Sequence, residues 1–437
     1  MRLTAASWAG AALALSLLTA GVPQPSSATT TSAADVPCSA ISADLPTQEA
    51  ISPSRPLELL GVPRAQALLD RTARSGSPVR VAVVDSGVID TPRIPVVRRV
   101  GFTRLTEIRH FHGTAVAGLI AGQPSADGAP VGVAPDAEIV DVRVFDDDAP
   151  TDSISADVQP ARVAQGLRWV ARHSARLDIG VVNVSLMVAD DPRLAAAVRA
   201  LRRADVVVVA STGNRPTQPG QPLYPDFATL SPGEDAAAWV FPAGYPGVVG
   251  VNATSGIADA DDLAAVLQSS ATDVAAPTPG AVTVALNGGT CVLTDVATSW
   301  SAAEVSGVVA LLRARFPDDN SRQIIARLTV TASAAPGSAS PLVGAGVVQP
   351  VEALTRPLHP TRAGVVAESL PAPDRLPKAS QPVVAADDGA ALRRTVLWWG
   401  LVAGGVVVLA LLLRPLLSRR RAPARPSGPS AGSAPEG

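Results

Sequence analysis

Asp85, His112, Asn214 and Ser299 are the residues of this sequence whose types and order could carry out acyl-transfer chemistry. Peptide-bond hydrolysis by a serine needs a nucleophile, a base that takes its proton, an anion that orients the base, and a donor that stabilises the tetrahedral oxyanion. A hydroxyl, an imidazole, a carboxylate and a carboxamide can supply these functions. The order Asp, His, Ser along the chain is one of the known orders of such triads.

Each of these residues also has an ordinary structural interpretation. Asp-Ser-Gly after a strand is a common turn, a histidine at a helix start is often a cap, and asparagine in a turn is commonly structural. Ser301 and Glu304 could form a capping box at the helix that Ser299 begins. The catalytic interpretation depends on the combination, because each residue lies at the end of a predicted strand or the start of a predicted helix.

Strands alternate with helices through the middle of the chain. The predicted strands cover residues 79–85, 137–144, 181–185, 206–210, 248–251 and 282–286. The predicted helices cover residues 63–74, 112–121, 161–173, 194–203, 301–315 and 321–330. This alternation predicts an α/β fold with a mainly parallel sheet between helices. Open parallel sheets bind ligands at the carboxyl ends of their strands, where Asp85 is predicted to lie.

The two ends of the chain carry apolar segments of different lengths. Residues 8–20 follow Arg2 and are too short to span a bilayer, which is typical of a secretory signal peptide. Small residues near Ala28 predict that residues 1–28 are this signal peptide. Residues 395–413 form an uncharged run of 19 residues and predict a transmembrane helix, with a buried soluble helix as the alternative.

The arginines beside residues 395–413 predict an orientation. More arginines follow this segment than precede it, so the positive-inside rule places residues 414–437 in the cytoplasm. The folded domain then lies outside the cell membrane, in agreement with export. We therefore expect a single-pass membrane protein with an extracytoplasmic domain.

Composition divides the rest of the chain into three parts. Residues 29–56 are rich in Ser, Thr, Ala and Pro and predict an irregular N-terminal extension. Residues 57–355 hold the predicted strands and helices, and their core must be built mainly from Ala, Val and Leu because aromatic residues make up only 3% of the chain. Prolines recur through residues 356–392 and predict a semi-rigid linker.

Cysteine, histidine and charge content limit the classes of partner. Cys38 and Cys291 are the only cysteines, and in an exported protein we expect them to be bridged. Two cysteines and scattered histidines do not make a tetrahedral set, so no metal ion or other cofactor is expected. The acidic run 146–148 is interpreted as a solvated loop, with a calcium site as the alternative. The net charge of −2 gives no electrostatic reason to expect nucleic acid.

Three segments resemble the signatures of subtilisin-like serine proteases: Val83-Val84-Asp85-Ser86-Gly87-Val88, His112-Gly113-Thr114-x-Val116-Ala117-Gly118 and Thr298-Ser299-x-x-Ala302. The resemblance extends over about residues 57–355. It implies a subtilisin-like three-layer fold and a serine endopeptidase that acts on proteins or peptides.

The resemblance also implies roles for individual residues. Ser299 is then the nucleophile, His112 the general base and later the acid, and Asp85 the orienting carboxylate. Asn214 is the side-chain donor of the oxyanion hole, beside the backbone N–H of Ser299. Ser185, Leu186 and Met187 lie in the segment that lines the P1 pocket in this family.

Further segments are similar to the mycosins, the subtilases of actinobacterial type VII secretion: Leu60-Gly61-Val62-x-Arg64-Ala65, Gly132-Val133-Ala134-Pro135-Asp136-Ala137 and Gly346-Val347-Val348-x-Pro350-Val351-x-Ala353-Leu354. The order of signal peptide, extension, protease domain, linker and membrane helix is similar too. This resemblance implies that the chain processes secreted substrates and supports a type VII secretion membrane complex.

The sequence departs from the family pattern near the nucleophile and near the P1 pocket. Ala297 stands where the family usually has Gly, which predicts a strained loop, and Ala303 stands where it usually has Pro. Met187 and Val188 replace the glycines that many subtilisins carry beside the P1 pocket, so we expect a narrowed pocket. Two other functions remain open, namely an idle protease scaffold within a secretion complex and a general cell-surface protease.

Overall fold

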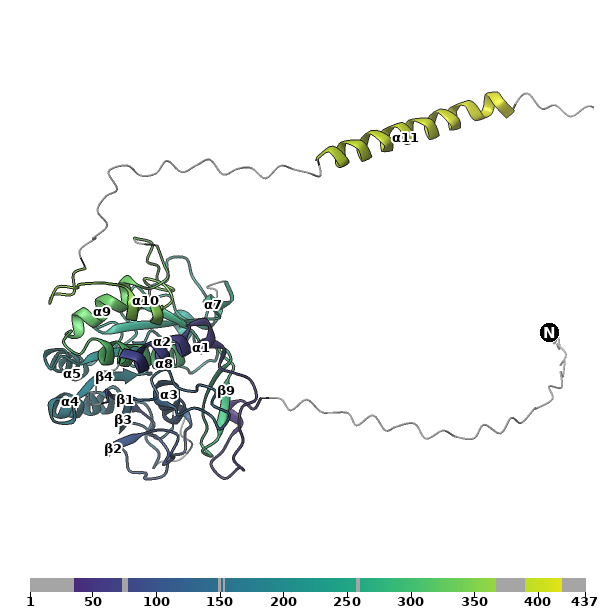
Figure 1. Cartoon of the computed structure of the whole chain (residues 1–437). Helices are drawn as coiled ribbons and strands as arrows, with labels where there is room; N and C mark the ends of the chain where they lie inside the picture. Colours follow the sequence, from purple (N-terminus) through teal and green to yellow (C-terminus); the bar gives the residue numbers. More distant parts are fainter. Residues whose placement is uncertain are drawn as a thin grey trace, which may run out of the picture. The chain divides into compact units, whose positions relative to one another are not determined.

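The computed structural model (Figure 1) describes residues 35–72, 78–147, 151, 154–256, 260–335, 337–366 and 390–418. They belong to two units, Met1–Ala367 and Glu368–Gly437, which are described separately. The predicted signal peptide lies outside the described residues, as do most of the predicted linker and most of the predicted cytoplasmic tail.

The first unit is organised around a seven-stranded sheet in which neighbouring strands run parallel. The strand order is β2-β3-β1-β4-β5-β6-β7. The strands are β1 (Arg80–Asp85), β2 (Val96–Gly101), β3 (Glu138–Arg143), β4 (Ile179–Val184), β5 (Val207–Ser211), β6 (Val249–Thr254) and β7 (Val274–Pro277). The central strands are almost continuously buried, as β-branched runs in a covered parallel sheet should be. The predicted α/β fold is confirmed.

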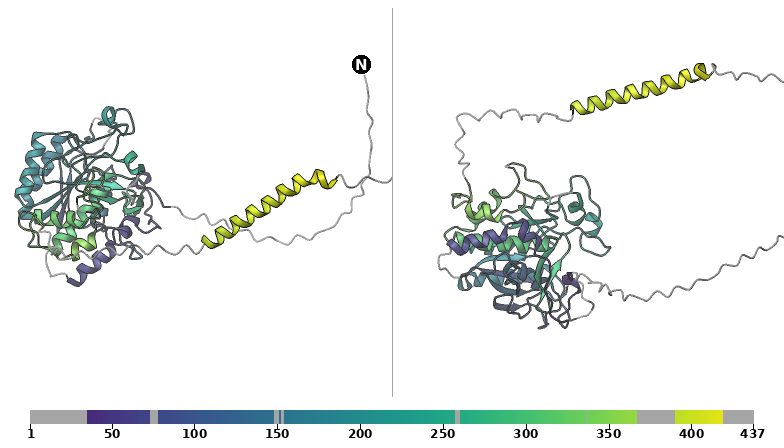
Figure 2. Two further views of the ribbon diagram at one scale, coloured as in Figure 1. Left: turned by 90° about the horizontal axis from the view of Figure 1, so that it is seen from above. Right: turned by 45° about the vertical axis from the view of Figure 1, so that its right-hand side comes forward.

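Alternate side chains of β1 belong to different hydrophobic clusters, one on each face of the sheet. Val81 and Val83 pack with α3 (His112–Ala121) and α8 (Thr298–Arg315). Ala82 and Val84 pack instead with α4 (Pro160–Leu177) and α5 (Pro192–Arg203). Because successive side chains of a strand point to opposite faces, helices cover both faces of the sheet (Figure 2). The shorter or later helices of this unit are α1 (Arg55–Leu59), α2 (Val62–Thr72), α6 (Tyr224–Phe227), α7 (Ala260–Ala265), α9 (Ser321–Val330) and α10 (Pro350–Thr355).

The structure adds strands that the sequence patterns did not predict. β2 lies at the edge of the sheet and carries exposed arginines, so it lacks the apolar pattern of a buried strand. β7 has only four residues, too few for a clear pattern. The strand predicted at residues 282–286 corresponds to β8 (Ala281–Val284), which pairs antiparallel with β9 (Thr290–Leu293) in a separate hairpin.

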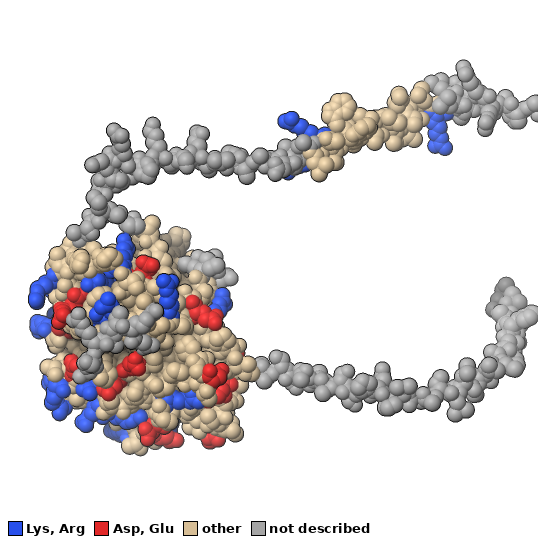
Figure 3. Space-filling model, in the orientation of Figure 1, with Lys and Arg blue, Asp and Glu red and all other residues tan. Residues whose placement is uncertain are grey.

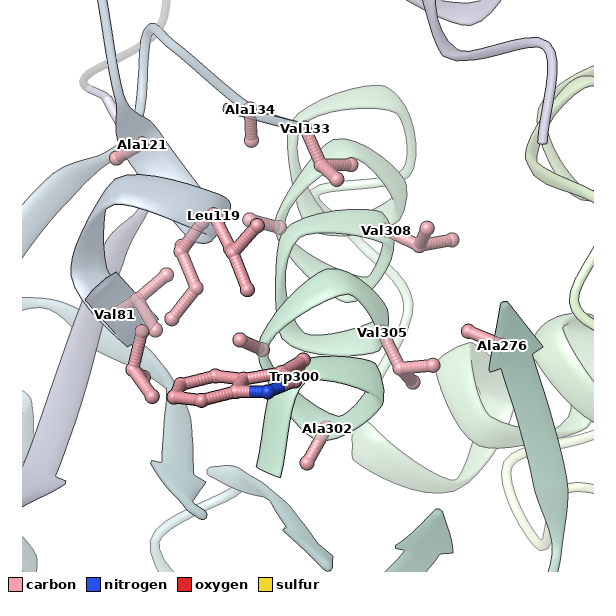
Figure 4. Close-up of a cluster of buried hydrophobic side chains, with 14 of the residues drawn as sticks. Val81, Leu119, Ala121, Val133, Ala134, Ala276, Trp300, Ala302, Val305 and Val308 are labelled. Carbon is pink, nitrogen blue, oxygen red and sulfur yellow. The ribbon is translucent and has the colours of Figure 1, made fainter. Parts of the chain in front are cut away.

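Helix α8 contributes Trp300, Ala302, Val305 and Val308 to a cluster of buried hydrophobic side chains (Figure 4). It packs against α3 and against strands β4 to β7. It begins at Thr298 with Ala297 as its N-cap, and no side chain caps it. The predicted capping box is therefore wrong: the Ser301 hydroxyl donates to the Thr298 carbonyl (3.0 Å), and Glu304 is fully buried. Neither carboxylate oxygen of Glu304 has a hydrogen-bond partner among the described residues.

The N-terminal extension is fastened to the β8–β9 hairpin. Cys38 and Cys291 form a disulfide with a Cα–Cα distance of 4.9 Å, which confirms the predicted bridge. The Val292 N–H donates to the Val36 carbonyl (3.1 Å), and the Thr290 N–H donates to the Gln48 carbonyl (2.9 Å). The extension thus runs along β9 and is part of the folded unit.

The second unit contains one helix, α11 (Ala390–Ser418), among its described residues. Its segment Leu392–Arg414 is long and apolar enough to cross a membrane and includes the predicted span 395–413. Its large apolar side chains are exposed. Figure 3 shows basic side chains at the two ends of the helix and none between them, the pattern expected for charges that flank a hydrocarbon core.

We expect loss of the disulfide to destabilise the first unit. The Cys38→Ser/Cys291→Ser variant should lose about 2–4 kcal/mol of unfolding free energy, because the bridge restricts the unfolded chain. Urea titration of the two proteins measures this difference from the midpoints and slopes. A thiol reagent should leave the native wild-type protein unlabelled, and labelling of both cysteines before unfolding would contradict the prediction.

Burial gives Glu304 an effect on stability that depends on pH. Desolvation raises the pKa of this carboxyl well above its ordinary value. The folded protein therefore keeps a proton that the unfolded chain loses above about pH 4.3. This contribution to stability is complete below that pH and is lost as the pH rises through the raised pKa, by roughly 1.4 kcal/mol per pH unit.

Glu304→Gln needs no proton, so it should stabilise the protein more at pH 8 than at pH 5 relative to the wild type. Urea unfolding at the two pH values measures the difference. Glu352→Gln, at an exposed position of α10, is the matched control and should show no such pH dependence. An equal effect of Glu304→Gln at both pH values would contradict the prediction.

Candidate active site

The carboxylate of Asp85 is hydrogen-bonded to the imidazole of His112. Asp85 ends β1 and is fully buried, and His112 is the first residue of α3. The distance from Asp85 Oδ1 to His112 Nδ1 is 2.8 Å, and the same oxygen accepts the Ser86 N–H at 2.7 Å. Because an ionised carboxylate can only accept, this contact favours the neutral imidazole tautomer that carries its proton on Nδ1.

Ser86 and Gly113 bring the strand and the helix together. The Ser86 hydroxyl accepts the Gly113 N–H (2.9 Å) and donates to the His110 carbonyl (3.2 Å). A Cβ at position 113 would lie 2.5 Å from the Gly87 carbonyl oxygen, closer than any side chain tolerates. Only glycine therefore allows His112 to reach Asp85, and Ser86 is a positioning residue that the sequence analysis did not identify.

Ser299 is the second residue of α8, and two reciprocal hydrogen bonds join it to the segment after β4. The Ser299 hydroxyl donates to the Ser185 carbonyl (3.0 Å), and the Ser185 hydroxyl donates to the Ser299 carbonyl (2.7 Å). Within the described part of the chain, the Ser299 hydroxyl makes no hydrogen bond to His112. Contacts between a nucleophile and its base are often incomplete before substrate binds.

Trp300 places His112 beside the start of α8. The ring centroids of His112 and Trp300 are 4.8 Å apart, and the indole is only 7% exposed. Because Trp300 directly follows Ser299, the imidazole lies next to the helix turn that carries the hydroxyl. The structure thus joins the predicted carboxylate and imidazole directly and places the imidazole against the residue that follows Ser299.

Asn214 follows β5 and contacts the residue before Ser299. Its side-chain oxygen accepts both the Thr298 N–H (2.8 Å) and the Thr298 hydroxyl (3.0 Å). These two donors fix the orientation of the carboxamide and leave its Nδ2 without a hydrogen-bond partner among the described residues. The Ser299 N–H belongs to the first turn of α8, where backbone N–H groups have no intrahelical acceptor. Two donors are therefore available beside Ser299.

The predicted substrate-binding segment lies next to this site. The residue that follows Met187 is joined to Phe241, because Val188 and Phe241 exchange two backbone hydrogen bonds (2.9 and 3.2 Å). Leu186 is buried in the cluster that contains β4 and β5. The Met187 sulfur lies 2.8 Å from the position that a Cβ at Gly213 would take, so the thioether fills the space beside Gly213.

The acidic run 146–148 was interpreted from the sequence as a solvated loop, but its first residue is buried. Asp146 is fully buried, contacts Arg143 (2.5 Å) and accepts the Ala156 N–H (2.9 Å). Burial of a carboxylate requires such partners, and an isolated acidic run does not reveal them. Asp148 lies outside the described residues, among which no group of three or more metal-ligating side chains occurs.

Comparison with known proteins identifies the fold. The profile of the Subtilase family matches residues 76–346. Mycosin-1 of Mycobacterium tuberculosis is 34% identical over 355 residues, which cover 71% of this chain and 78% of that protein. The structure of MycP3 protease from the type VII (ESX-3) secretion system is 30% identical, with a TM-score of 0.56 over 74% of this chain and 98% of that one.

A larger assembly also contains a similar chain. It is the periplasmic assembly from the ESX-5 inner membrane complex, with 25% identity and a TM-score of 0.57 over 80% of this chain and 94% of that one. The family match spans β1 to the residues after α9, so it includes all four residues singled out by their chemistry. The chain belongs to the subtilase family of serine endopeptidases and, within it, to the mycosin type.

Proposed function

We propose that this chain is a membrane-anchored, extracytoplasmic serine endopeptidase in which Asp85, His112 and Ser299 form the catalytic triad. The observation that carries the proposal is the 2.8 Å bond between Asp85 and His112, made next to the helix turn that holds Ser299. Its substrates are proteins or peptides exported by a type VII secretion system, since similar chains come from such systems.

In the proposed mechanism, the Ser299 hydroxyl leaves the Ser185 carbonyl and gives its proton to His112 Nε2 as Ser299 attacks the substrate carbonyl. Asp85 keeps the imidazole in the required tautomer and stabilises the imidazolium that forms. The oxyanion of the tetrahedral intermediate is stabilised by the Asn214 Nδ2–H and the Ser299 N–H. His112 then returns the proton to the leaving amine, and water hydrolyses the acyl-enzyme in a second, equivalent cycle.

The two alanines near Ser299 are compatible with this chemistry. Ala297 has φ −142° and ψ 131°, which is extended backbone that any residue adopts. The strain predicted from the loss of glycine is therefore absent. Ala303 lies fully buried inside α8, where alanine has the highest helix propensity. Both alanines therefore fit the backbone at the start of α8 without strain.

The protease domain is proposed to cover residues 57–355 and to be tethered by residues 356–392. The apolar segment Leu392–Arg414 would anchor it in the cell membrane, with residues 414–437 in the cytoplasm. The mechanism described above uses side chains, the Ser299 backbone N–H and water alone, and the proposal includes no cofactor. Membership of a secretion membrane complex is proposed from the assembly that contains a similar chain.

A second function is favoured by one observation. The Ser299 hydroxyl is bound to the Ser185 carbonyl and not to His112. If this arrangement persisted when a peptide binds, the domain would act as a structural component of the secretion complex with an idle triad.

Ser299→Ala should abolish labelling by a fluorophosphonate probe and lower peptide hydrolysis by roughly 10⁶-fold, the scale found for triad serines. Ser321→Ala, at the start of α9, is the control and should be labelled like the wild type. Gel fluorescence and circular dichroism measure labelling and folding. A folded wild-type protein that takes up no probe would contradict the proposed activity.

Ser299→Ala also distinguishes the proteolytic function from the scaffold function in cells. If proteolysis is the function, the set of processed secreted proteins should change in Ser299→Ala while secretion itself continues. The scaffold function predicts that only deletion of the whole chain alters the secretome. Quantitative comparison of secreted proteins from wild type, Ser299→Ala and deletion strains distinguishes these outcomes.

Met187 should limit the size of the substrate side chain at the P1 position. Because its sulfur fills the space beside Gly213, Met187→Gly should raise kcat/KM for peptides with P1 Leu or Phe, relative to P1 Ala, by about 10-fold or more. Met187→Leu has a similar volume and is the matched control, with an unchanged ratio. An unchanged ratio in Met187→Gly would show that another residue closes the pocket.

A further inference from the structure

Arg215, the residue after Asn214, forms a buried ion pair with Glu234. The side chains of Arg215 and Glu234 are 4% and 1% exposed. Two parallel hydrogen bonds join them, from Nη1 to Oε2 (2.8 Å) and from Nη2 to Oε1 (2.7 Å). This bidentate geometry is the strongest form of such a contact.

The guanidinium of Arg215 also donates to three backbone carbonyls. Nε donates to Leu263 (2.8 Å), Nη1 to Phe227 (3.0 Å) and Nη2 to Val266 (3.1 Å). Together with the bonds to Glu234, these use all five N–H donors of an arginine. Phe227 ends α6, Leu263 lies in α7 and Val266 follows it. A single side chain therefore links two connections of the sheet, the one from β5 to β6 and the one from β6 to β7.

The backbone around Asn214 is held by the same segment. The Arg215 N–H donates to the Ala265 carbonyl (2.8 Å), and Asn214 forms an antiparallel bridge with Val266. The Leu267 N–H donates to the Gly213 carbonyl (3.1 Å). Arg215 thus binds, through its backbone and its side chain, the strand-like segment that pairs with Asn214.

Glu234 remains charged in this environment. Burial raises the pKa of its carboxyl, but hydrogen bonds from Arg215 and from the Gln268 N–H outweigh this effect and hold the pKa below its ordinary value. Two charges buried together must overcome a large desolvation cost, and apolar residues of similar size often give equal stability. A stability role alone therefore does not explain why an ion pair occupies this position.

We propose that Arg215 and Glu234 are positioning residues for the oxyanion hole, holding the Asn214 backbone so that Nδ2 meets the developing oxyanion. The inference rests on the proposed triad function. Thr298 fixes the carboxamide of Asn214 from the side of α8. The ion pair holds the backbone of Asn214 through the Leu263 and Val266 carbonyls, which belong to the segment that pairs with Asn214. Errors of about 1 Å in such placement can lower rates by roughly 100-fold.

Glu234→Gln tests the proposal because it removes the charge but keeps the shape of the side chain. In the full chain purified in detergent, kcat for a peptide substrate should fall about 10- to 100-fold while KM changes less than about twofold, since an oxyanion donor acts mainly in the transition state. Arg215→Lys, which keeps the charge but cannot bind Glu234 bidentately, should have the same effect. Rates are referred to protein that elutes as folded in gel filtration.

Two further variants distinguish positioning from general destabilisation. Asn214→Ala removes the donor, so adding Glu234→Gln to it should lower kcat by less than about twofold, whereas independent effects would multiply. Asp319→Asn breaks the Arg327–Asp319 pair (2.6 Å) of the α9 region and is the matched control. It should lower the urea midpoint without lowering kcat.

The inference is overturned if Glu234→Gln and Arg215→Lys keep wild-type kcat, or if their effects multiply with that of Asn214→Ala. Its failure is distinguishable from failure of the proposed function. If only the positioning role fails, the wild-type chain still hydrolyses peptides and binds the serine probe. If the proposed function fails, the wild-type chain does neither.

Discussion

The structure depends on the burial of one helix, α8, against the parallel sheet and against α3. Residues 300–312 of this helix are buried without interruption, and its neighbours include four strands. The helix cannot shift without opening the core, so the residues of its first turn are fixed in position. That turn holds Thr298, Ser299 and Trp300, which contact Asn214, Ser185 and His112 respectively. The candidate active site is thus held by the packing of the hydrophobic core.

The structure also requires that α3 and α8 approach neighbouring segments closely, and glycine residues in both helices permit this approach. A Cβ at Gly118 would lie 2.4 Å from the Thr283 hydroxyl, and one at Gly307 would lie 2.5 Å from a side-chain carbon of Val133. These contacts let α3 pack against β8 and let α8 pack against the segment that precedes β3. The small residues of the histidine motif therefore serve packing against the hairpin and α8 as well as the approach of His112 to Asp85.

The sequence allowed prediction of features that depend on local patterns. β-branched runs marked the central strands, and the motifs around Asp85, His112 and Ser299 marked the site because residue type and spacing carry that information. It did not predict β2, because this edge strand pairs on one side only and its exposed arginines interrupt the apolar pattern of a buried strand. It also missed Arg215 and Glu234, since an ion pair within the long connection from β5 to β6 leaves no periodic signal. The proposed capping box failed because tertiary burial of Glu304 overrode a local preference.

Activity and specificity are separated in this architecture. The groups proposed to act on the scissile bond are attached to α8, α3 and the end of β1, all within the rigid core. Met187 instead lies after β4, where its thioether packs beside Gly213. A change at Met187 can therefore alter which peptides enter without moving Ser299. A narrow protease can arise on this fold through a few side chains, while the machinery that cleaves the bond stays unchanged.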